Sequence, residues 1–204
     1  MSKIRLSSAL NSFLSIPDQG KNNLLIFFEG MHKKDTQHIK KFLKLENTKN
    51  LSFEEILSSS FFSGELSLKN NIDYICNLNF LNRDEFLNKY SLNEFYKINK
   101  NNRIREISKK DFVKVFEFLL YLESSKTSII ERDLVQTLRF MEFNSINLDY
   151  VENLFKTKQV LYFSNAENSH KISYMFDYFL AFDDNRNHIF TQHQSVFDNY
   201  IKSL

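Results

Sequence analysis

The sequence predicts a predominantly helical α+β fold built from two winged-helix-like units with short β-hairpins. Three observations predict this fold class. The chain has 204 residues but only 3 glycines and 1 proline, so few residues interrupt its helices. Apolar residues recur at helical spacing over much of the sequence. In two places a helical stretch is followed by short β-prone runs around a polar segment, which is the pattern of a hairpin.

Three helices are expected in the second half of the chain. The first covers residues 112–122, which are almost wholly apolar. The second is expected to begin at Ser128, because Glu131 follows it at the spacing of a capping box. The third begins at Asn147 after a polar break and has an apolar face. Three helices in this order are typical of a helix-turn-helix unit.

A hairpin is expected to follow these helices. Residues 160–163 and 171–176 are both β-prone, and a polar segment separates them. Together with the three helices, they give the layout of a winged helix-turn-helix. Residues 179–182 predict a further strand, and residues 195–204 predict a closing helix.

The first half of the chain shows the same order of elements. Residues 4–14 and 36–45 have apolar stripes at helical spacing. Ser52 and Ser67 are each placed to cap a helix that follows. Two β-prone runs, residues 95–98 and 103–107, flank a polar tip and predict a hairpin. We therefore expect two units, residues 1–107 and 108–204, with the boundary near Ser108.

The strongest apolar run of the chain is residues 24–28. It is apolar on all sides, which predicts either a central core helix or strand of the first unit or a segment that docks on a partner. The 22 phenylalanines favour a partner or self-association, because two small units bury a smaller fraction of their surface than one compact domain does.

Composition limits the environment of the protein. The formal net charge is +2, which is low for a protein that coats nucleic acid. The single cysteine excludes an internal disulfide and favours a reducing compartment. No run is long enough to span a membrane, and the first residues lack the apolar region of a secretory signal. We expect a soluble, cytoplasmic protein.

No motif predicts an enzyme, a cofactor or a metal site. The three glycines are too scattered for a phosphate-binding loop. Cys76 lies among apolar residues without a base and is expected to be a buried small side chain. Residues 183–188 resemble the first half of a calcium-binding loop, but His188 and Gln194 stand where the loop needs glycine and glutamate. A polar turn is therefore expected there.

The best candidate for nucleic-acid contact is the basic segment of residues 97–110. Only one acid, Glu106, lies among its cations, which could reach the phosphate backbone from a wing tip. The alternative is a solvated hairpin edge, where lysine discourages strand pairing. The six candidate residues are Lys97, Lys100, Arg103, Arg105, Lys109 and Lys110.

The third helix of the second unit points away from base recognition. Asp149 and Glu152 lie near its start, the end that would enter a DNA groove, and carboxylates there repel phosphates. A winged helix with an acidic or neutral recognition surface serves more often to dock proteins.

Size and element order resemble the kleisin-interacting tandem winged-helix subunits of SMC-type ATPase complexes, including the small subunit of Lamassu-type bacterial defence systems. The resemblance carries over no individual residue. It implies a non-enzymatic accessory or scaffolding subunit that joins an SMC-like ATPase on DNA, in anti-phage or anti-plasmid defence. The alternative is a stand-alone winged-helix DNA-binding protein, either a plasmid replication initiator or a transcriptional regulator. The expected partners are thus an ATPase subunit, DNA bound without sequence preference, and a second copy of the chain.

Overall fold

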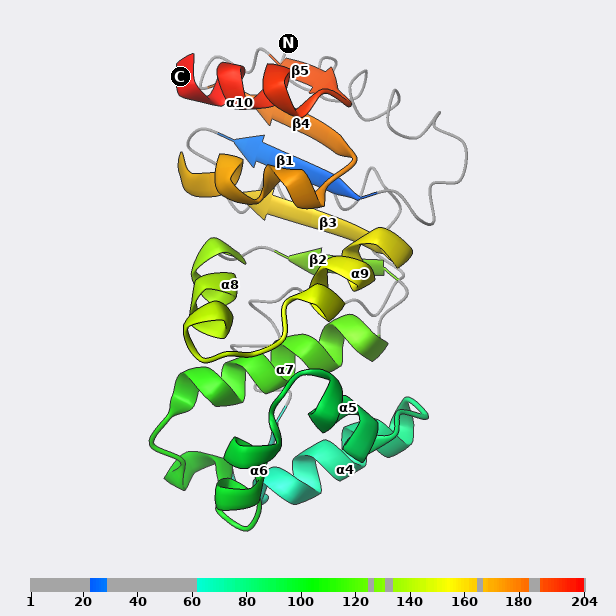
Figure 1. Ribbon diagram of the computed structural model, residues 1–204, viewed down its shortest axis with the longest axis vertical. Coiled ribbons are helices and arrows are strands. Elements are labelled where there is room, and N and C mark those ends of the chain that lie inside the picture. The colour runs from blue at the N-terminus through cyan, green and yellow to red at the C-terminus, as the bar shows by residue number, and fades with distance from the viewer. Residues whose placement is uncertain are drawn as a thin grey trace. The chain divides into compact units, whose positions relative to one another are not determined.

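The structure, a computed structural model, is a mixed α+β fold in which helix outweighs strand (Figure 1). This confirms the predominantly helical α+β class that the sequence predicts. The structure describes residues 23–28, 62–124, 127–130, 134–164, 167–183 and 188–203. The helices expected at residues 4–14, at 36–45 and after Ser52 lie outside these ranges.

The chain forms two compact units, but they differ from the two that the sequence predicts. Unit 1 comprises Met1–Leu51, Lys126–Val135 and Phe155–Leu204, and unit 2 comprises Ser52–Ser125 and Gln136–Leu154. The boundary predicted near Ser108 falls inside unit 2, between the 3₁₀ helix η3 (Ile104–Glu106) and the helix α7 (Lys110–Ser124). Unit 1 is discontinuous because its strands pair across long stretches of sequence.

Unit 1 contains a sheet of five strands among the described residues (Figure 1). The strands are β1 (Leu24–Phe28), β2 (Thr127–Ile130), β3 (Gln159–Ser164), β4 (Tyr178–Phe182) and β5 (His188–Thr191). Their order is β2-β3-β1-β4-β5, so β1, the first of the described strands, lies in the middle. The first four strands are parallel, and β5 pairs with β4 in the antiparallel direction.

The central strand β1 is the apolar run of residues 24–28. Leu24 pairs with Leu161 of β3 on one side and with Tyr178 of β4 on the other. A strand buried on both faces reads as a continuous apolar run, which explains why this stretch shows no alternation. The core interpretation of residues 24–28 is thereby confirmed.

Asn23 ties the start of β1 to both neighbouring strands. Its side-chain Oδ1 accepts a hydrogen bond from the Val160 N–H at 3.0 Å. Its main-chain carbonyl accepts another from the Tyr178 N–H at 3.1 Å. These bonds satisfy main-chain donors where the parallel strands begin and so fix their register.

The hairpin predicted for residues 160–176 is wrong. Residues 160–163 do form a strand, β3, but it pairs in parallel with β1 and β2. Residues 171–175 belong to the 3₁₀ helix η4 (Glu167–Met175). Within η4 the Ser173 hydroxyl donates to the His170 carbonyl at 2.7 Å, a local side-chain bond that competes with a strand.

The remaining expectations for unit 1 have mixed outcomes. Ser128 lies in strand β2 and does not begin a helix, because Thr127 and the isoleucines after Ser128 favour pairing with β3. Strand β4 and the closing helix α10 (Gln194–Ser203) lie where the sequence predicts them. Helix α10 packs against η4, β4 and β5.

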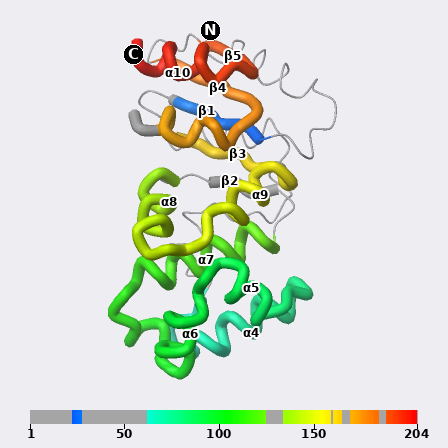
Figure 2. The backbone as a smooth tube through the Cα atoms, in the orientation of Figure 1, coloured from blue at the N-terminus to red at the C-terminus, as the bar shows by residue number. Residues whose placement is uncertain are grey.

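The described elements of unit 2 are all helices, and its chain can be followed from cyan through green to yellow in Figure 2. It contains η3, α7 and most of α8 (Leu134–Phe143) and α9 (Asp149–Thr157). It also contains α4 (Leu68–Leu78), α5 (Arg83–Lys89) and α6 (Asn93–Asn99). Helices α4, α7 and α9 confirm predictions made from Ser67, from residues 112–122 and from Asn147.

The hairpin predicted for residues 95–107 is wrong. Phe95 and Ile98 lie in helix α6, and residues 104–106 form η3. The ring of Phe95 stacks on Phe112 of α7 with 4.5 Å between centroids. Packing one short helix face against α7 therefore overrides the β-propensity of the aromatic run.

The core of unit 2 is centred on α7. Phe116 is fully buried, and its ring centroid lies 5.7 Å from that of Phe95 and 6.3 Å from that of Phe86. Two turns further on, Glu123 accepts a hydrogen bond from the Tyr90 hydroxyl at 2.7 Å and also pairs with Lys89. Both contacts join α5 to α7.

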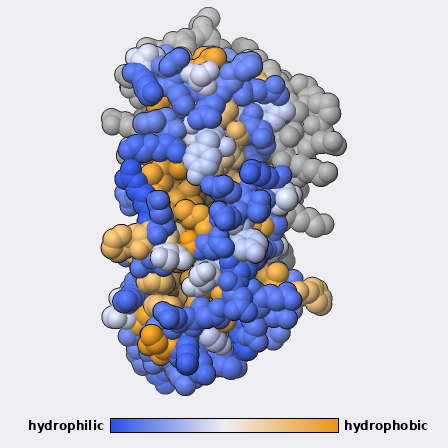
Figure 3. Space-filling view, in the orientation of Figure 1, coloured by the Kyte–Doolittle hydropathy of each residue, from blue (hydrophilic) through white to orange (hydrophobic). Residues whose placement is uncertain are grey.

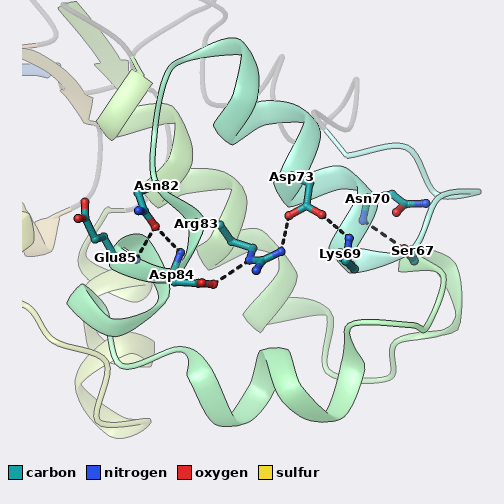
Figure 4. A network of polar contacts seen from close by, with 8 residues as sticks. All are labelled: Ser67, Lys69, Asn70, Asp73, Asn82, Arg83, Asp84 and Glu85. Carbon is teal, nitrogen blue, oxygen red and sulfur yellow. Dashed lines mark hydrogen bonds and ion pairs between the residues drawn. The ribbon is translucent and has the colours of Figure 1, made fainter.

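A chain of polar contacts joins α4 to α5 (Figure 4). Ser67 caps α4 by accepting from the Asn70 N–H at 3.2 Å. Arg83 of α5 donates to Asp73 of α4 at 2.9 Å, and Lys69 donates to the same carboxylate at 2.6 Å. Burial opposes ionisation of Asp73, but the hydrogen bonds from Lys69 and Arg83 outweigh it and lower its pKa.

Three helices of unit 2 end on a non-glycine residue in the left-handed conformation. The residues are Phe80, Ser91 and Ser145, with φ of 56°, 57° and 55°. In each case the next N–H bonds back to a carbonyl five residues earlier, as for Leu81 to Cys76 at 2.8 Å. This Schellman geometry normally takes glycine, which this chain hardly contains. Phe80 is the bulkiest of the three and is 97% exposed.

Replacing Phe80 with Gly is expected to raise the free energy of unfolding by about 0.5–1 kcal/mol. The change removes the steric cost of the left-handed conformation and loses little buried area. Phe80→Ala is the matched control, because it removes the same ring but keeps a Cβ and hence the steric cost. Urea unfolding of the three proteins gives the comparison. Equal effects of Gly and Ala would contradict the account.

Candidate functional site

All six cations of the predicted nucleic-acid segment are exposed and lie in unit 2. Lys97 and Lys100 lie at the end of α6, and Arg103 precedes η3. Arg105 lies within η3, and Lys109 and Lys110 lie at the start of α7. The predicted tip is therefore a loop, but it joins two helical elements rather than two strands.

Main-chain hydrogen bonds hold this loop against the start of α4. The Leu68 N–H donates to the Asn102 carbonyl at 3.0 Å, and the Lys69 N–H donates to the Lys100 carbonyl at 2.9 Å. Ser67 and Arg103 form an isolated antiparallel bridge. The loop thus satisfies N–H groups that the first turn of a helix leaves free, and its own position is fixed in return.

Three of the six cations are occupied by contacts within unit 2. Arg105 pairs with Glu65 at 2.7 Å. The Lys110 ammonium donates to the Ile104 carbonyl at 2.6 Å. The Lys109 ammonium lies 5.7 Å from the centre of the Phe112 ring.

The other three cations are Lys97, Lys100 and Arg103, which we call the basic loop. No described residue pairs with their side chains. Exposed cations that lie within seven residues and have no partner in the described part of the chain are suited to contact neighbouring phosphates of a nucleic acid. The structure therefore divides the predicted set into three cations with contacts inside unit 2 and three without a partner among the described residues.

A hollow of about 320 Å³ lies beside this segment in unit 2. Apolar side chains of Phe95, Ile98 and Phe112 line it, together with polar residues of both signs. The polar lining residues are Ser91, Glu94, Asn99, Ser108, Lys109 and Asn144. Sequence reasoning missed the hollow because its lining comes from three separate stretches of chain.

Several large apolar side chains of unit 2 are exposed. Figure 3 shows apolar side chains that stand out from a mostly hydrophilic face of the molecule. Beside the hollow, Ile98 is 77% exposed, and Phe143, next to the lining residue Asn144, is 89% exposed. The described residues of unit 2 also expose Leu66, Tyr74, Leu78, Phe80 and Tyr150.

The sheet of unit 1 has the topology in which ligands commonly bind at the carboxyl ends of parallel strands. The chain leaves β1 for β2, which lies on the β3 side of β1, and it leaves β3 for β4, which lies on the opposite side of β1. Because these two connections run in opposite directions, a crevice is expected between the carboxyl ends of β1 and β3. The polar side chain described there is Ser164, which is buried. Its hydroxyl contacts those of Tyr162 and Ser169, so its bonding is internal.

The thiol of Cys76 has a structural role. Burial raises the pKa of the Cys76 thiol to about 11, which keeps it protonated and unreactive at neutral pH. Among the residues that the structure describes, no three His, Cys, Asp or Glu side chains group as metal ligands do. The calcium-loop resemblance at residues 183–188 falls largely on 184–187, outside the described ranges.

Glu117 of α7 is a buried acid that sequence reasoning missed. Only 5% of it is exposed, and its carboxylate accepts from the Phe62 N–H at 2.9 Å. Burial raises the pKa of Glu117 to about 7, and the hydrogen bond from Phe62 opposes part of this rise. A single carboxyl in an otherwise apolar stretch of helix was the available signal.

Within the described residues, no helix is both long and apolar enough to cross a membrane.

Helix α9 begins with the acids predicted to repel DNA, Asp149 and Glu152, in its first turn. Acids at that position are stabilised by the helix dipole, which gives them a structural reason.

The fold and these surfaces define a mixed α+β protein with a mainly parallel sheet and a helical unit. Comparison with models of known protein families finds no match, and comparison with curated proteins finds none either. Among solved structures, the chain is similar to one described as the ATP-binding subunit of an ABC transporter. The TM-score is 0.49 at 10% identity, and the match covers 89% of this chain and 82% of the other. A similarity of this strength carries no function over to this chain.

Proposed function

We propose that the chain is a non-enzymatic, cytoplasmic accessory subunit of an SMC-like ATPase complex that acts on DNA. The observation that carries this proposal is the basic loop, whose three side chains have no partner among the described residues. The subunit contributes weak phosphate contacts, and the complex as a whole supplies affinity and ATP hydrolysis.

The placement of the basic loop supports a DNA-backbone contact. Its main chain is fixed by bonds to α4, so binding requires little ordering of the loop. Lysine and arginine side chains on such a loop bind phosphate without reading bases. The neighbouring cations Arg105, Lys109 and Lys110 already have contacts within unit 2. We therefore expect few phosphate contacts and a low affinity for DNA.

Three features of the described residues support a role without catalysis. The thiol of Cys76 is buried with a raised pKa, and Asp73 is engaged with Lys69 and Arg83. The hydroxyls of Ser164 and Ser169 contact each other inside unit 1. These potential nucleophiles and acids stabilise the fold.

The ATPase partner is proposed from the chain's size, its near-neutral charge and the exposed apolar side chains of unit 2. The hairpins that also suggested tandem winged helices are absent from the segments where they were expected. Copurification with a coiled-coil ATPase encoded beside this chain, after coexpression, tests the assignment directly. A chain that remains free of that ATPase would favour the stand-alone DNA-binding alternative.

Replacing Lys97, Lys100 and Arg103 together with Ala is expected to weaken DNA binding at least tenfold at low salt. The loss should be equal on unrelated duplexes, because phosphate contacts carry no sequence information. Fluorescence anisotropy with two labelled duplexes of different sequence measures it.

The matched control for this change removes three other exposed lysines, Lys156, Lys171 and Lys202. The net charge falls by the same amount, so a purely global charge effect would weaken binding equally in both variants. Equal losses would contradict the basic loop as the site. A strong preference for one duplex that persists at high salt would favour a regulator or replication initiator.

A further inference from the structure

We propose that Glu65 restrains DNA binding beside the basic loop by competing with phosphate for the guanidinium of Arg105. The inference rests on the proposed function and deepens it, because it names a fourth cation of the same surface and the acid that withholds this cation. In the native chain Arg105 pairs with Glu65, and without that carboxylate it contacts the DNA backbone.

Main-chain hydrogen bonds hold Glu65 beside Arg105. The Arg105 N–H donates to the Gly64 carbonyl at 3.3 Å, and the Ile104 N–H donates to the Leu66 carbonyl at 3.1 Å. Glu65 lies between these two acceptors, and its carboxylate pairs with the Arg105 guanidinium at 2.7 Å. Because the acid is tethered in this way, its effective concentration at the guanidinium is high. A phosphate of weakly bound DNA must compete with that tethered carboxylate.

The guanidinium of Arg105 is suited to bind phosphate once Glu65 is removed. The exposed fractions of the two side chains are 52% for Arg105 and 67% for Glu65, so the pair lies in water. An arginine binds a carboxylate and a phosphate through the same planar fork of N–H donors. An exposed ion pair contributes little to stability, so its loss should leave the fold of unit 2 intact.

Arg105 belongs to the same exposed segment as the basic loop. Ile104 is buried, whereas its neighbours Arg103 and Arg105 are both exposed. Two residues of chain span at most about 7 Å, so the two arginines leave the main chain close together. DNA that contacts Arg103 therefore brings phosphates close to Arg105 and Glu65. The Glu65 carboxylate repels these phosphates in addition to occupying the guanidinium.

Replacing Glu65 with Gln is expected to add one phosphate contact. A plot of the logarithm of the binding constant against that of salt concentration should steepen from a slope of about −2.7, for the three cations of the basic loop, to about −3.6. Affinity for DNA should rise about tenfold at 50 mM salt and about threefold at 200 mM salt. Fluorescence anisotropy with a labelled duplex measures both quantities, and circular dichroism should be unchanged.

Two further proteins show whether the gain comes through Arg105. A double variant that combines Glu65→Gln with Arg105→Ala lacks the released cation, so its slope should return to about −2.7. Glu85→Gln is the charge-matched control, because Glu85 is an exposed acid of α5 that forms none of the ion pairs of the described residues. A steeper slope that persists in the double variant, or that Glu85→Gln reproduces, would overturn the inference.

The same measurements separate this inference from the proposed function. A native slope of about −2.7 that Glu65→Gln leaves unchanged would overturn the role of Glu65 and retain the basic loop as the site. A native slope of about −3.6 would show that Arg105 already contacts phosphate, which also overturns the inference. Slopes near zero for both the native protein and Glu65→Gln would overturn the inference and the proposed function together.

Discussion

Replacing Glu117 with Gln is expected to raise the free energy of unfolding at pH 8 by about 3 kcal/mol and to change it little at pH 4. The pKa of Glu117 rises from 4.5 in its ordinary state to about 7 in the folded protein. Folding therefore favours the protonated form. The native protein keeps the full stabilisation from the protonated Glu117 carboxyl below about pH 4.5 and loses it as the pH rises to about 7.

The amide of glutamine does not ionise, so the variant avoids burying a charge at high pH. Its side-chain carbonyl can still accept from the Phe62 N–H. Urea unfolding at several pH values between 4 and 8 measures the difference. Glu94→Gln, an exposed acid of α6, is the control and should leave the pH dependence intact. A Glu117→Gln protein with the pH profile of the native protein would show that the carboxyl is not buried as described.

Replacing Phe116 with Ala is expected to lower the free energy of unfolding by about 3–5 kcal/mol. The ring is fully buried and contacts the rings of Phe86 and Phe95, so its loss leaves a cavity at the centre of unit 2. Hydrogen exchange should show the greatest loss of protection in α5, α6 and α7.

Phe80→Ala serves as the control, because it removes a phenyl ring that is 97% exposed. Its hydrogen exchange should match that of the native protein. Loss of protection centred on β1, β3 and β4 in the Phe116→Ala protein would contradict the assignment of Phe116 to the core of unit 2.

Local sequence signals predict the elements whose residues contact their own neighbours. Ser67 accepts from the Asn70 N–H three residues later, and α4 begins where this cap predicts. The mostly buried apolar run of α7 has a length and composition that allow little besides a core helix. The fold class, mixed α+β and mostly helical, follows from such elements.

Parallel pairing could not be predicted in the same way. The register of β1 is set by Leu161 and Tyr178, which lie far along the chain. Periodicity shows that residues 160–163 favour a strand but contains no information about its partner. The nearest β-prone run, residues 171–176, predicted a hairpin with residues 160–163. Long-range pairing within the sheet overrides this local pairing.

The candidate site was predicted in part. The six cations of residues 97–110 do lie on one exposed segment, because they are close in sequence. The contacts that separate the paired cations from the others are not all local, since Arg105 pairs with Glu65, which lies 40 positions earlier. The hollow also depends on tertiary packing, which brings Asn144 beside residues of α6 and α7.

The salt dependence of DNA binding tests the central claim most directly. If Lys97, Lys100 and Arg103 each neutralise one phosphate, a plot of the logarithm of the binding constant against that of salt concentration should have a slope of about −2.7. Affinity would then fall about 40-fold between 50 and 200 mM salt. The triple Ala variant should show a slope near zero, and the Lys156, Lys171 and Lys202 control should keep the native slope. A native slope near zero, or one that the triple Ala variant retains, would contradict the account.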